Sequence, residues 1–217
     1  MTRAVFLDLD GTLMRSDPGI IRSVLHVLEH MGLSAPQEYP TWLIGPTLDT
    51  SFVKLGVPEA RVPEALDRYC ARYDTEGFKE AEVYDGVLGA LEQLKTAGYR
   101  MALATSKPRI VATDVVKHFG IAPYLDHVLG AEVEGHDTSK KENLLARGLA
   151  AFGVTAQACV MVGDRLYDVA GAKAHQMPVI GAAYGYGCAP ELRTAGADRI
   201  IDHARDLPAA VAELIQT

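Results

Sequence analysis

The feature that most constrains the fold is a regular alternation of short apolar runs with longer amphipathic stretches across the second half of the chain. The short runs have the composition of buried strands, and the longer stretches repeat their apolar residues at helical spacing. Strand alternating with helix predicts a parallel sheet covered by helices on both faces. The predicted strands are residues 4–9, 100–106, 127–131, 159–164 and 178–183, and the predicted helices are residues 87–98, 110–120, 140–153 and 168–176.

Glycines support these helix boundaries. Gly98, Gly120 and Gly153 each fall where a predicted helix should stop, as expected for residues that close helices in a left-handed conformation. Asp85 and Gly86 stand before a predicted helix and are suited to its start.

One connection is far longer than a crossover helix requires. About 70 residues of mostly helical pattern separate the first predicted strand from the second. We therefore expect an α/β protein with a Rossmann-like parallel-sheet core, formed by residues 1–14 and 83–217. A small all-helical domain of residues 15–82 is inserted after the first strand, with helices expected at 17–32 and 58–73.

Charge and cysteine content limit the compartment and the partners. The 217 residues include 28 acidic and 21 basic side chains, and this net charge of -7 disfavours a nucleic acid polymer or an anionic membrane as a partner. The three cysteines are far apart, which predicts neither a disulfide framework nor a thiolate zinc site. Without an apolar stretch of roughly 20 residues to span a membrane, we expect a cytoplasmic monomer or homodimer that binds a small metabolite.

Acidic residues follow two of the predicted strands directly. Asp8 and Asp10 end the first strand, and Asp164 ends the fourth, with Asp168 four residues further on. Carboxyl ends of parallel strands meet at one edge of a sheet, where ligands bind. Carboxylates this close cannot all stay ionised without a cation. Asp8, Asp10 and Asp164 therefore predict an all-oxygen Mg²⁺ site supported by Asp168.

Other metal sites fit poorly. If Gly11 were the sixth residue of a calcium-binding loop, Phe6 would take the first ligand position, which needs an oxygen donor. The seven histidines form no ligand cluster in the sequence, which disfavours zinc.

Hydroxyl groups end a third strand. Thr105 or Ser106, together with the N–H groups of the helix that follows, would bind an anion such as phosphate, and Lys107 comes next. Either hydroxyl is a candidate to hold the phosphoryl group, and Ser106 and Lys107 are candidate substrate contacts.

Two adjacent lysines, Lys140 and Lys141, begin a later helix. Neighbouring residues on a helix point about 100° apart, so only one ammonium group should reach the same phosphate. Lys141 is the better candidate because it lies three and four residues before Leu144 and Leu145, which mark the buried face.

Taken in order, these motifs resemble those of the haloacid dehalogenase superfamily, in the branch that carries a helical cap. The motifs are DLDGTL at 8–13, the threonine in ATSKP at 104–108, the lysine at 140 or 141, and GDRLYD at 163–168. The resemblance implies that Asp8 is a nucleophile, Asp10 an acid and base, Thr105 a phosphate ligand and the lysine an anion-stabilising group, with Mg²⁺ as cofactor.

The dehalogenases of this superfamily lack the second aspartate, so Asp10 indicates a phosphatase that forms an aspartyl-phosphate. The chain looks most like phosphoglycolate phosphatases and bacterial 5'-nucleotidases. This implies a phosphoric monoester hydrolase that acts on a phosphoglycolate-like or nucleoside 5'-monophosphate substrate. Because the cap selects the substrate in such enzymes, Trp42, Gly45 and Thr47 are candidate substrate contacts.

Two other interpretations remain open. A sugar phosphomutase of the same superfamily would share these motifs but protect its phosphoenzyme from water. A receiver domain of a signalling protein also uses an acidic pair, magnesium, threonine and lysine, but it carries no inserted helical domain. A nucleotide-binding module is the least favoured, because the sequence contains neither G-x-x-x-x-G-K-[ST] nor G-x-G-x-x-G.

Overall fold

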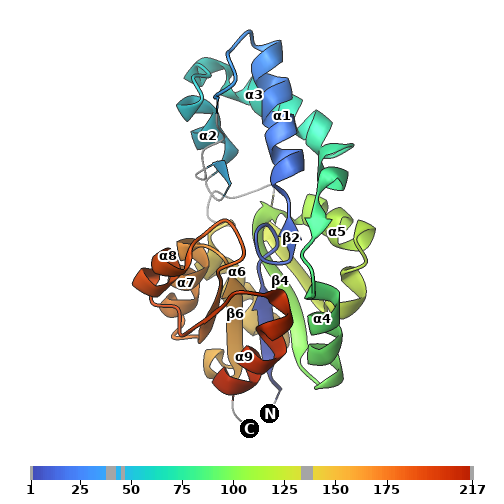
Figure 1. The fold of residues 1–217 in the computed structure, drawn as a ribbon, viewed down its shortest axis with the longest axis vertical. Helices are drawn as coiled ribbons and strands as arrows, with labels where there is room; N and C mark the ends of the chain where they lie inside the picture. The colour runs from blue at the N-terminus through green and yellow to red at the C-terminus, as the bar shows by residue number, and fades with distance from the viewer. Residues whose placement is uncertain (1, 38–42, 45–46, 133–138, 216–217) are drawn as a thin grey trace. The chain divides into compact units, whose positions relative to one another are not determined.

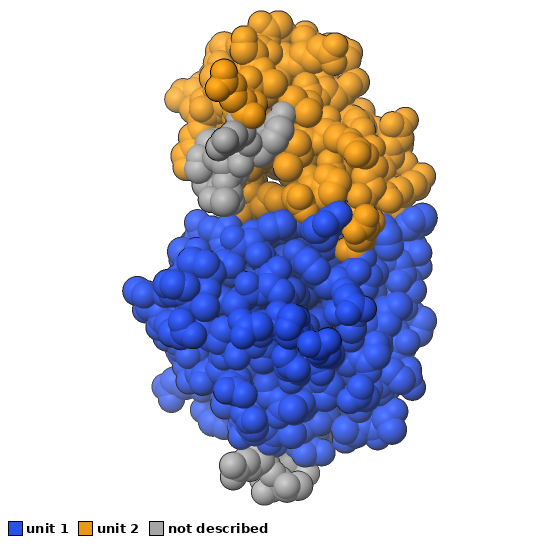
Figure 2. Space-filling view, in the orientation of Figure 1, with its two compact units in different colours: residues 1–15, 83–217 blue, residues 16–82 orange. Residues whose placement is uncertain are grey.

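The computed structural model describes residues 2–37, 43–44, 47–132 and 139–215. The chain divides into two compact units, one formed by residues 1–15 and 83–217 and the other by residues 16–82, which are coloured separately in Figure 2. Where the chain passes between the units, β2 (Met14–Arg15) and β3 (Glu82–Val83) form a two-stranded sheet.

The larger unit is built on a parallel sheet of six strands in the order β5-β4-β1-β6-β7-β8 (Figure 1). The five predicted strands and their parallel pairing are confirmed, and β8 is an addition that the sequence pattern did not predict. The strands are β1 (Ala4–Leu7), β4 (Arg100–Pro108), β5 (His127–Ala131), β6 (Cys159–Gly163), β7 (Val179–Ala182) and β8 (Arg199–Ile201).

Strand β1 lies in the middle of the sheet and determines where a site can form. Leu7, its last residue, is opposite Leu103 of β4 on one side and Val162 of β6 on the other. From β1 the chain goes outward through β4 and β5, and it returns to the other side of β1 for β6. The carboxyl end of β1 is therefore a point where the strand order reverses, the usual place for a ligand in an open parallel sheet.

Helices cover both faces of this sheet. Ala4 and Phe6 of β1 pack in a core with Leu144 and Leu145, so the fully buried Val5 and Leu7 face the opposite side, because side chains alternate along a strand. Helices α6 (Lys141–Phe152), α7 (Leu166–Ala174) and α8 (Ala189–Ala195) pack in sequence on the first side. Helix α4 (Val87–Thr96) packs with α9 (Leu207–Leu214), and α5 (Arg109–His118) lies along β4 and β5.

The helix boundaries follow the predicted glycines. Gly98, Gly120 and Gly153 have φ values of 81°, 71° and 64° at or just after the ends of α4, α5 and α6. These left-handed conformations suit glycine because it has no Cβ.

The smaller unit contains α1 (Asp17–His30), α2 (Leu48–Lys54) and α3 (Val62–Tyr73). The predicted single helix over 58–73 is wrong at its start: residues 59–61 form a 3₁₀ turn, and the α-helix begins at Val62. Pro63 has no N–H and therefore fits only the first turn. Arg72 of α3 binds Glu80 through both terminal nitrogens, at 2.9 and 3.3 Å, and also donates to Ser23 of α1. No helix among the described residues has the length and apolar character that crossing a membrane requires.

Candidate active site

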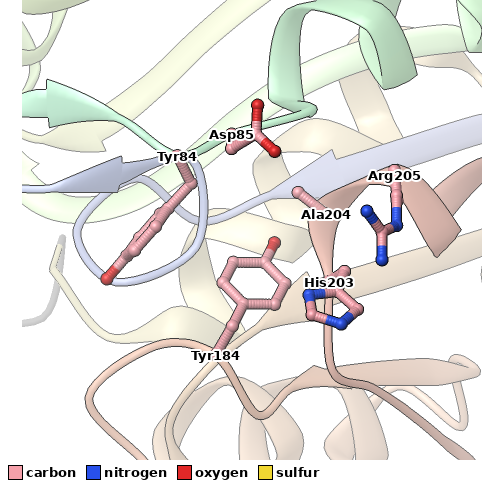
Figure 3. Close-up of a pocket in the computed structure, with 6 residues that line it drawn as sticks. All are labelled: Tyr84, Asp85, Tyr184, His203, Ala204 and Arg205. Atoms are coloured by element: carbon pink, nitrogen blue, oxygen red, sulfur yellow. The ribbon is translucent and has the colours of Figure 1, made fainter.

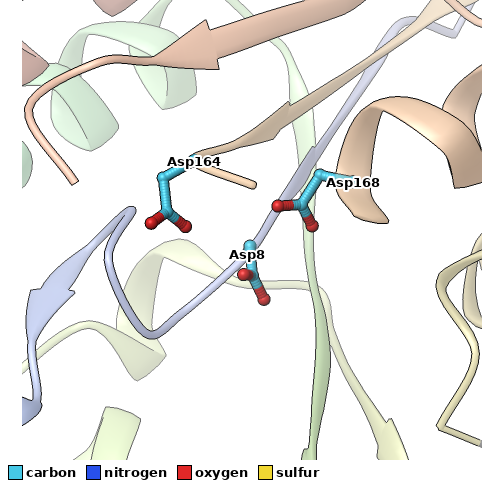
Figure 4. A group of neighbouring side chains, drawn as sticks. All are labelled: Asp8, Asp164 and Asp168. Atoms are coloured by element: carbon cyan, nitrogen blue, oxygen red, sulfur yellow. The ribbon is translucent and has the colours of Figure 1, made fainter. Parts of the chain in front are cut away.

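Three carboxylates converge at the carboxyl edge of the sheet in the larger unit. Asp8 directly follows β1, Asp164 directly follows β6, and Asp168 lies in the first turn of α7. One carboxylate oxygen from each lies within 4.8 Å of the others, and Figure 4 shows the three side chains pointing toward a common centre. Asp164 and Asp168 are buried, and Asp8 keeps partial exposure. The register of the strands brings Asp8 and Asp164 together, because Leu7 pairs with Val162.

Lys141 is the cation of this cluster. Its Nζ lies 2.8 Å from Asp8 Oδ1, 2.7 Å from Asp168 Oδ1 and 2.7 Å from the Ala104 carbonyl oxygen. The contacts with Asp8 and Ala104 are hydrogen bonds, and the contact with Asp168 is an ion pair. Lys141 is buried in the first turn of α6, whereas Lys140 precedes the helix and is exposed.

Burial dominates the electrostatics of the acids. Burial raises the pKa of Asp8 to about 7, with Lys141 opposing this shift and Asp168 adding to it. Burial, reinforced by Asp168 and Asp8, raises the pKa of Asp164 to about 8. Burial alone would lower the pKa of Lys141, but the carboxylates of Asp168 and Asp8 outweigh it and raise that pKa above its ordinary value. Lys141 therefore remains a cation, and the cluster holds more carboxylate than it can keep ionised without a further positive charge.

Asp10 is not one of these three acids, but it lies close enough for its charge to contribute to the raised pKa of Asp8. The sequence grouped it with Asp8 and Asp164, but the acids that the structure brings within 4.8 Å of one another are Asp8, Asp164 and Asp168. The Asp10 carboxylate instead lies 3.1 Å from Lys107 Nζ through Oδ2, with the two side chains 19% and 9% exposed. In the described part of the chain, the buried Oδ1 of Asp10 has no hydrogen-bond partner. An unpaired buried oxygen is costly, and a bound ligand is one way to satisfy it.

Thr105 and Ser106 point to different partners. Thr105 is buried, and its Oγ1 accepts the backbone N–H of Lys107 at 3.2 Å. This leaves the hydroxyl proton of Thr105 to donate to an incoming oxygen. The exposed Ser106 donates to the carbonyl oxygen of Ser139 at 3.0 Å, just before α6.

Asp164 is supported by groups that the sequence analysis did not identify. Thr12 Oγ1 donates to its Oδ1 at 3.3 Å, and the backbone N–H of Tyr186 donates to its Oδ2 at 2.8 Å. Gly11, with a φ of 87°, comes so close that a Cβ there would collide with the Asp164 carboxylate. The sequence signal that was available is the run Tyr184 to Gly187, in which alternate glycines permit a close approach of the backbone.

Asp168 has a second role at the start of α7. Its Oδ2 accepts the backbone N–H of Arg165 at 3.1 Å, which is half of a capping box for this helix. The same carboxylate thus fixes the beginning of α7 and holds Lys141.

The predicted substrate contacts of the smaller unit are less informative. Trp42 and Gly45 lie outside the described residues. Thr47 precedes α2, where its hydroxyl lies 3.1 Å from that of Thr50. A role for Thr47 in binding substrate stays a prediction.

The cluster fits a magnesium ion. Its donors are carboxylate oxygens, which suit hard cations such as Mg²⁺. Burial, with a smaller contribution from the neighbouring carboxylates, raises the pKa of Asp8 and of Asp164, and a bound cation would offset both effects. Asp8, Asp164 and Asp168 are the side chains that could hold it or orient its ligands.

A central strand end with an aspartate cluster, a paired lysine and a hydroxyl on the adjacent strand is suited to an enzyme that binds a phosphoryl group. The family model described as haloacid dehalogenase-like hydrolase matches residues 5–182. The chain belongs to this family.

Its relatives have several names. The chain is 37% identical over 191 residues to a 5'-nucleotidase of Pseudomonas aeruginosa, covering 87% of this chain and 86% of that protein. It is 38% identical over 184 residues to the tyrosine-protein kinase PtkA of Mycobacterium tuberculosis, covering 84% of this chain. The match spans only 62% of the length of PtkA. A crystal structure of a predicted phosphatase from Clostridium acetobutylicum superimposes with a TM-score of 0.89 at 33% identity, covering 99% of this chain and 100% of that one.

Proposed function

We propose that the protein is a magnesium-dependent phosphatase that hydrolyses a small phosphomonoester through an aspartyl-phosphate on Asp8. The observation that carries this proposal is the Asp8 carboxylate at the end of the central strand, 2.8 Å from Lys141 and within 4.8 Å of carboxylate oxygens of Asp164 and Asp168. A carboxylate can attack phosphorus and so split one difficult hydrolysis into two easier steps.

In the first step, the Asp8 carboxylate attacks phosphorus while the bond from phosphorus to the ester oxygen breaks. The leaving oxygen takes a proton from Asp10, whose buried Oδ1 is without a partner among the described residues. Thr105 donates its hydroxyl proton to a phosphoryl oxygen. Lys141 is fixed beside Asp8 and offsets the negative charge that the equatorial oxygens carry in the transition state.

In the second step, the Asp10 carboxylate takes a proton from water as the water oxygen attacks the phosphorus of the aspartyl-phosphate. The bond from phosphorus to Asp8 breaks, inorganic phosphate leaves, and Asp8 and protonated Asp10 are restored. Proton transfer by one positioned group contributes typically 10²- to 10⁴-fold in rate.

The metal would be held by Asp8 and Asp164, with Asp168 supporting the site from α7. When bound, Mg²⁺ supplies positive charge beside the transferring phosphoryl group. The side chain of Asp10 then serves proton transfer, while its ion pair with Lys107 holds the carboxylate in place.

The substrate is a small phosphorylated metabolite, of the phosphoglycolate type or a nucleoside 5'-monophosphate. Support for the second class comes from the name of the Pseudomonas aeruginosa relative. Support for the first comes from Lys107, an ammonium group beside the proposed proton donor, because the leaving group would bind there.

The test is release of inorganic phosphate from a panel of phosphomonoesters by the purified chain, with Mg²⁺ and with EDTA. We expect turnover only with Mg²⁺. Asp8→Asn is the matched control, because it keeps the shape of the side chain and removes the nucleophilic charge. Phosphate release that persists in Asp8→Asn would contradict the proposal, and a stable phosphoenzyme that water does not discharge would favour phosphoryl transfer to another acceptor.

A further inference from the structure

The carboxylate of Asp164 is held from two directions by segments far apart in the sequence. Thr12, in the turn after β1, donates its hydroxyl proton, and Tyr186, in the loop after β7, donates its backbone N–H. Thr12 lies between β1 and β2, and Tyr186 lies between β7 and α8.

Tyr184 joins these two segments. Its hydroxyl donates to the backbone carbonyl oxygen of Thr12 at 2.9 Å, and it stands two residues before Tyr186 in the same loop. Burial, together with the nearby Asp164 and Tyr84, raises the pKa of the Tyr184 hydroxyl, so it remains a proton donor at ordinary pH. One hydrogen bond therefore links both donors of Asp164 to each other.

The glycines on either side of Tyr186 show how closely this loop approaches the site. A Cβ at Gly185 would collide with the Gly11 carbonyl oxygen and the Asp164 side chain, and one at Gly187 would collide with the Asp164 carbonyl oxygen. The loop is thus in contact with Asp164 along its length, and a shift of the loop would move the carboxylate.

The Tyr184 ring lines a pocket of about 130 Å³ in the larger unit. Figure 3 shows the ring among the other side chains that line this pocket. Tyr84 meets the ring edge-on, with centroids 5.2 Å apart and planes at 71°. The remaining lining residues are Asp85, His203, Ala204 and Arg205. A ring beside open space can reorient unless its hydroxyl holds it, so the bond to Thr12 matters more here than it would in a filled core.

We infer that Tyr184 is a positioning residue for the metal site, which sets the affinity for Mg²⁺ by holding the two donors that orient Asp164. This inference relies on the proposed function only for the identity of the ion. Groups that orient metal ligands from outside typically change metal affinity 10- to 100-fold when they are removed. Thr12 contacts Asp164 directly, whereas Tyr184 acts on Asp164 through Thr12, so removing the Tyr184 hydroxyl should weaken Mg²⁺ binding less.

The experiment measures Mg²⁺ binding to the whole chain by calorimetry, without substrate. We expect Tyr184→Phe to weaken Mg²⁺ binding about three- to tenfold and Thr12→Val to weaken it about tenfold. Tyr84→Phe is the matched control, because it removes a hydroxyl from the neighbouring ring, and it should change the affinity less than about twofold. The effects of Tyr184→Phe and Thr12→Val on Mg²⁺ affinity should not add in the double variant, because both substitutions remove hydrogen bonds of the same network around Asp164.

A positioning role makes a second prediction that general damage to the fold does not. Phosphatase turnover of Tyr184→Phe should return to the wild-type value once Mg²⁺ is saturating, and its melting temperature in EDTA should match that of the wild type. Unchanged Mg²⁺ affinity in Tyr184→Phe, or in Thr12→Val if the first variant does not fold, would overturn the inference. Failure of the wild type to bind Mg²⁺ would overturn the proposed metal dependence as well, so the two failures are distinguishable.

Discussion

Lys141 Nζ lies 2.8 Å from Asp8 Oδ1, and its other two contacts, to Asp168 and the Ala104 carbonyl oxygen, are both 2.7 Å long. The ammonium group is thus held by one acceptor from each of three chain segments. A buried lysine held by two hydrogen bonds and an ion pair has little freedom, so its charge is fixed beside the proposed nucleophile before any substrate arrives.

The first prediction follows from this arrangement. Lys141→Met should lower phosphatase turnover by the order of a hundredfold or more, as expected when one preorganised charge-stabilising group is lost. Lys140→Met is the control, because Lys140 is exposed at the start of the same helix, and it should change turnover little. Steady-state kinetics at saturating Mg²⁺ measures both. A larger loss in Lys140→Met would show that Lys140, and not Lys141, has this role.

The second prediction concerns pH and metal. Asp8 and Asp164 have pKa values near 7 and 8, raised from 3.8, so their neutral forms stabilise the metal-free fold. This contribution is complete below their ordinary pKa. It declines from about pH 4 upward, because the folded state still binds protons that the unfolded state has already lost, and it is gone once the pH has risen through 7 and 8. The melting temperature in EDTA should therefore fall between about pH 4 and about pH 8 through these groups and become level above that range.

Mg²⁺ should reverse this trend, because it binds the ionised carboxylates. Its stabilisation of the fold should grow over the same pH range, and binding should release protons. Thermal melts with and without Mg²⁺ in a pH series measure the first effect, and calorimetry in buffers of different ionisation enthalpy measures the second. A Mg²⁺-induced shift in melting temperature that stays constant with pH would contradict the assignment.

The third prediction tests Asp10. Asp10→Asn should slow hydrolysis of alkyl phosphates far more than that of activated phenyl phosphates, because only alkoxide leaving groups need a proton. The rate of phosphoenzyme breakdown has to be measured in the same experiment, because Asp10 is also proposed to activate water. Equal losses in the phosphorylation step for both kinds of substrate would show that Asp10 is not the proton donor.

The parts of the fold that the sequence predicted are those with long, unambiguous patterns. The five strands with continuous apolar runs were recognised because strands buried on both faces contain few polar residues, so each forms a clear apolar segment in the sequence. Strand β8 was missed because Arg199–Ile201 is short and begins with a charged residue. Helices α8 and α9 were missed too: seven and eight residues give too few turns for a clear helical period.

The site divides in the same way. The closeness of Asp8 and Asp164 could be predicted from the sequence because each lies at the end of a predicted strand. The two strands are neighbours, and their register places both residues at the same edge of the sheet. The support from Tyr186 was missed, because a backbone N–H has no sequence signature of its own and the alternate glycines beside it indicate only a close approach of the backbone. The partner of Asp10 was also unforeseen, since alternation places Asp8 and Asp10 on one face only while the strand continues, and β1 ends at Leu7.

The fourth prediction concerns Lys107, which the sequence assigned to substrate contact and the structure places on Asp10. A general acid lies within hydrogen-bond distance of the leaving oxygen, about 3 Å. Lys107 Nζ is 3.1 Å from the same carboxylate. Because the two contacts use different oxygens of Asp10, the ammonium group lies within about 8 Å of the leaving oxygen, a distance over which charges still interact in a partly buried site. A carboxylate one carbon from that oxygen, as in phosphoglycolate, would fall beside it.

Two substrates of matched shape test this directly. Phosphoglycolate and 2-hydroxyethyl phosphate differ mainly in the carboxylate, so the ratio of their kcat/KM values isolates the effect of that charge. We expect the wild type to prefer phosphoglycolate and Lys107→Met to lose most of this preference, by about tenfold or more, as for one charge-assisted contact. Lys140→Met again serves as the control, because it removes a lysine that is exposed rather than buried beside Asp10. If Lys107→Met keeps the preference for phosphoglycolate, Lys107 only holds Asp10 and does not contact the substrate. If the wild type hydrolyses neither compound, the result favours nucleoside 5'-monophosphates as the substrate class.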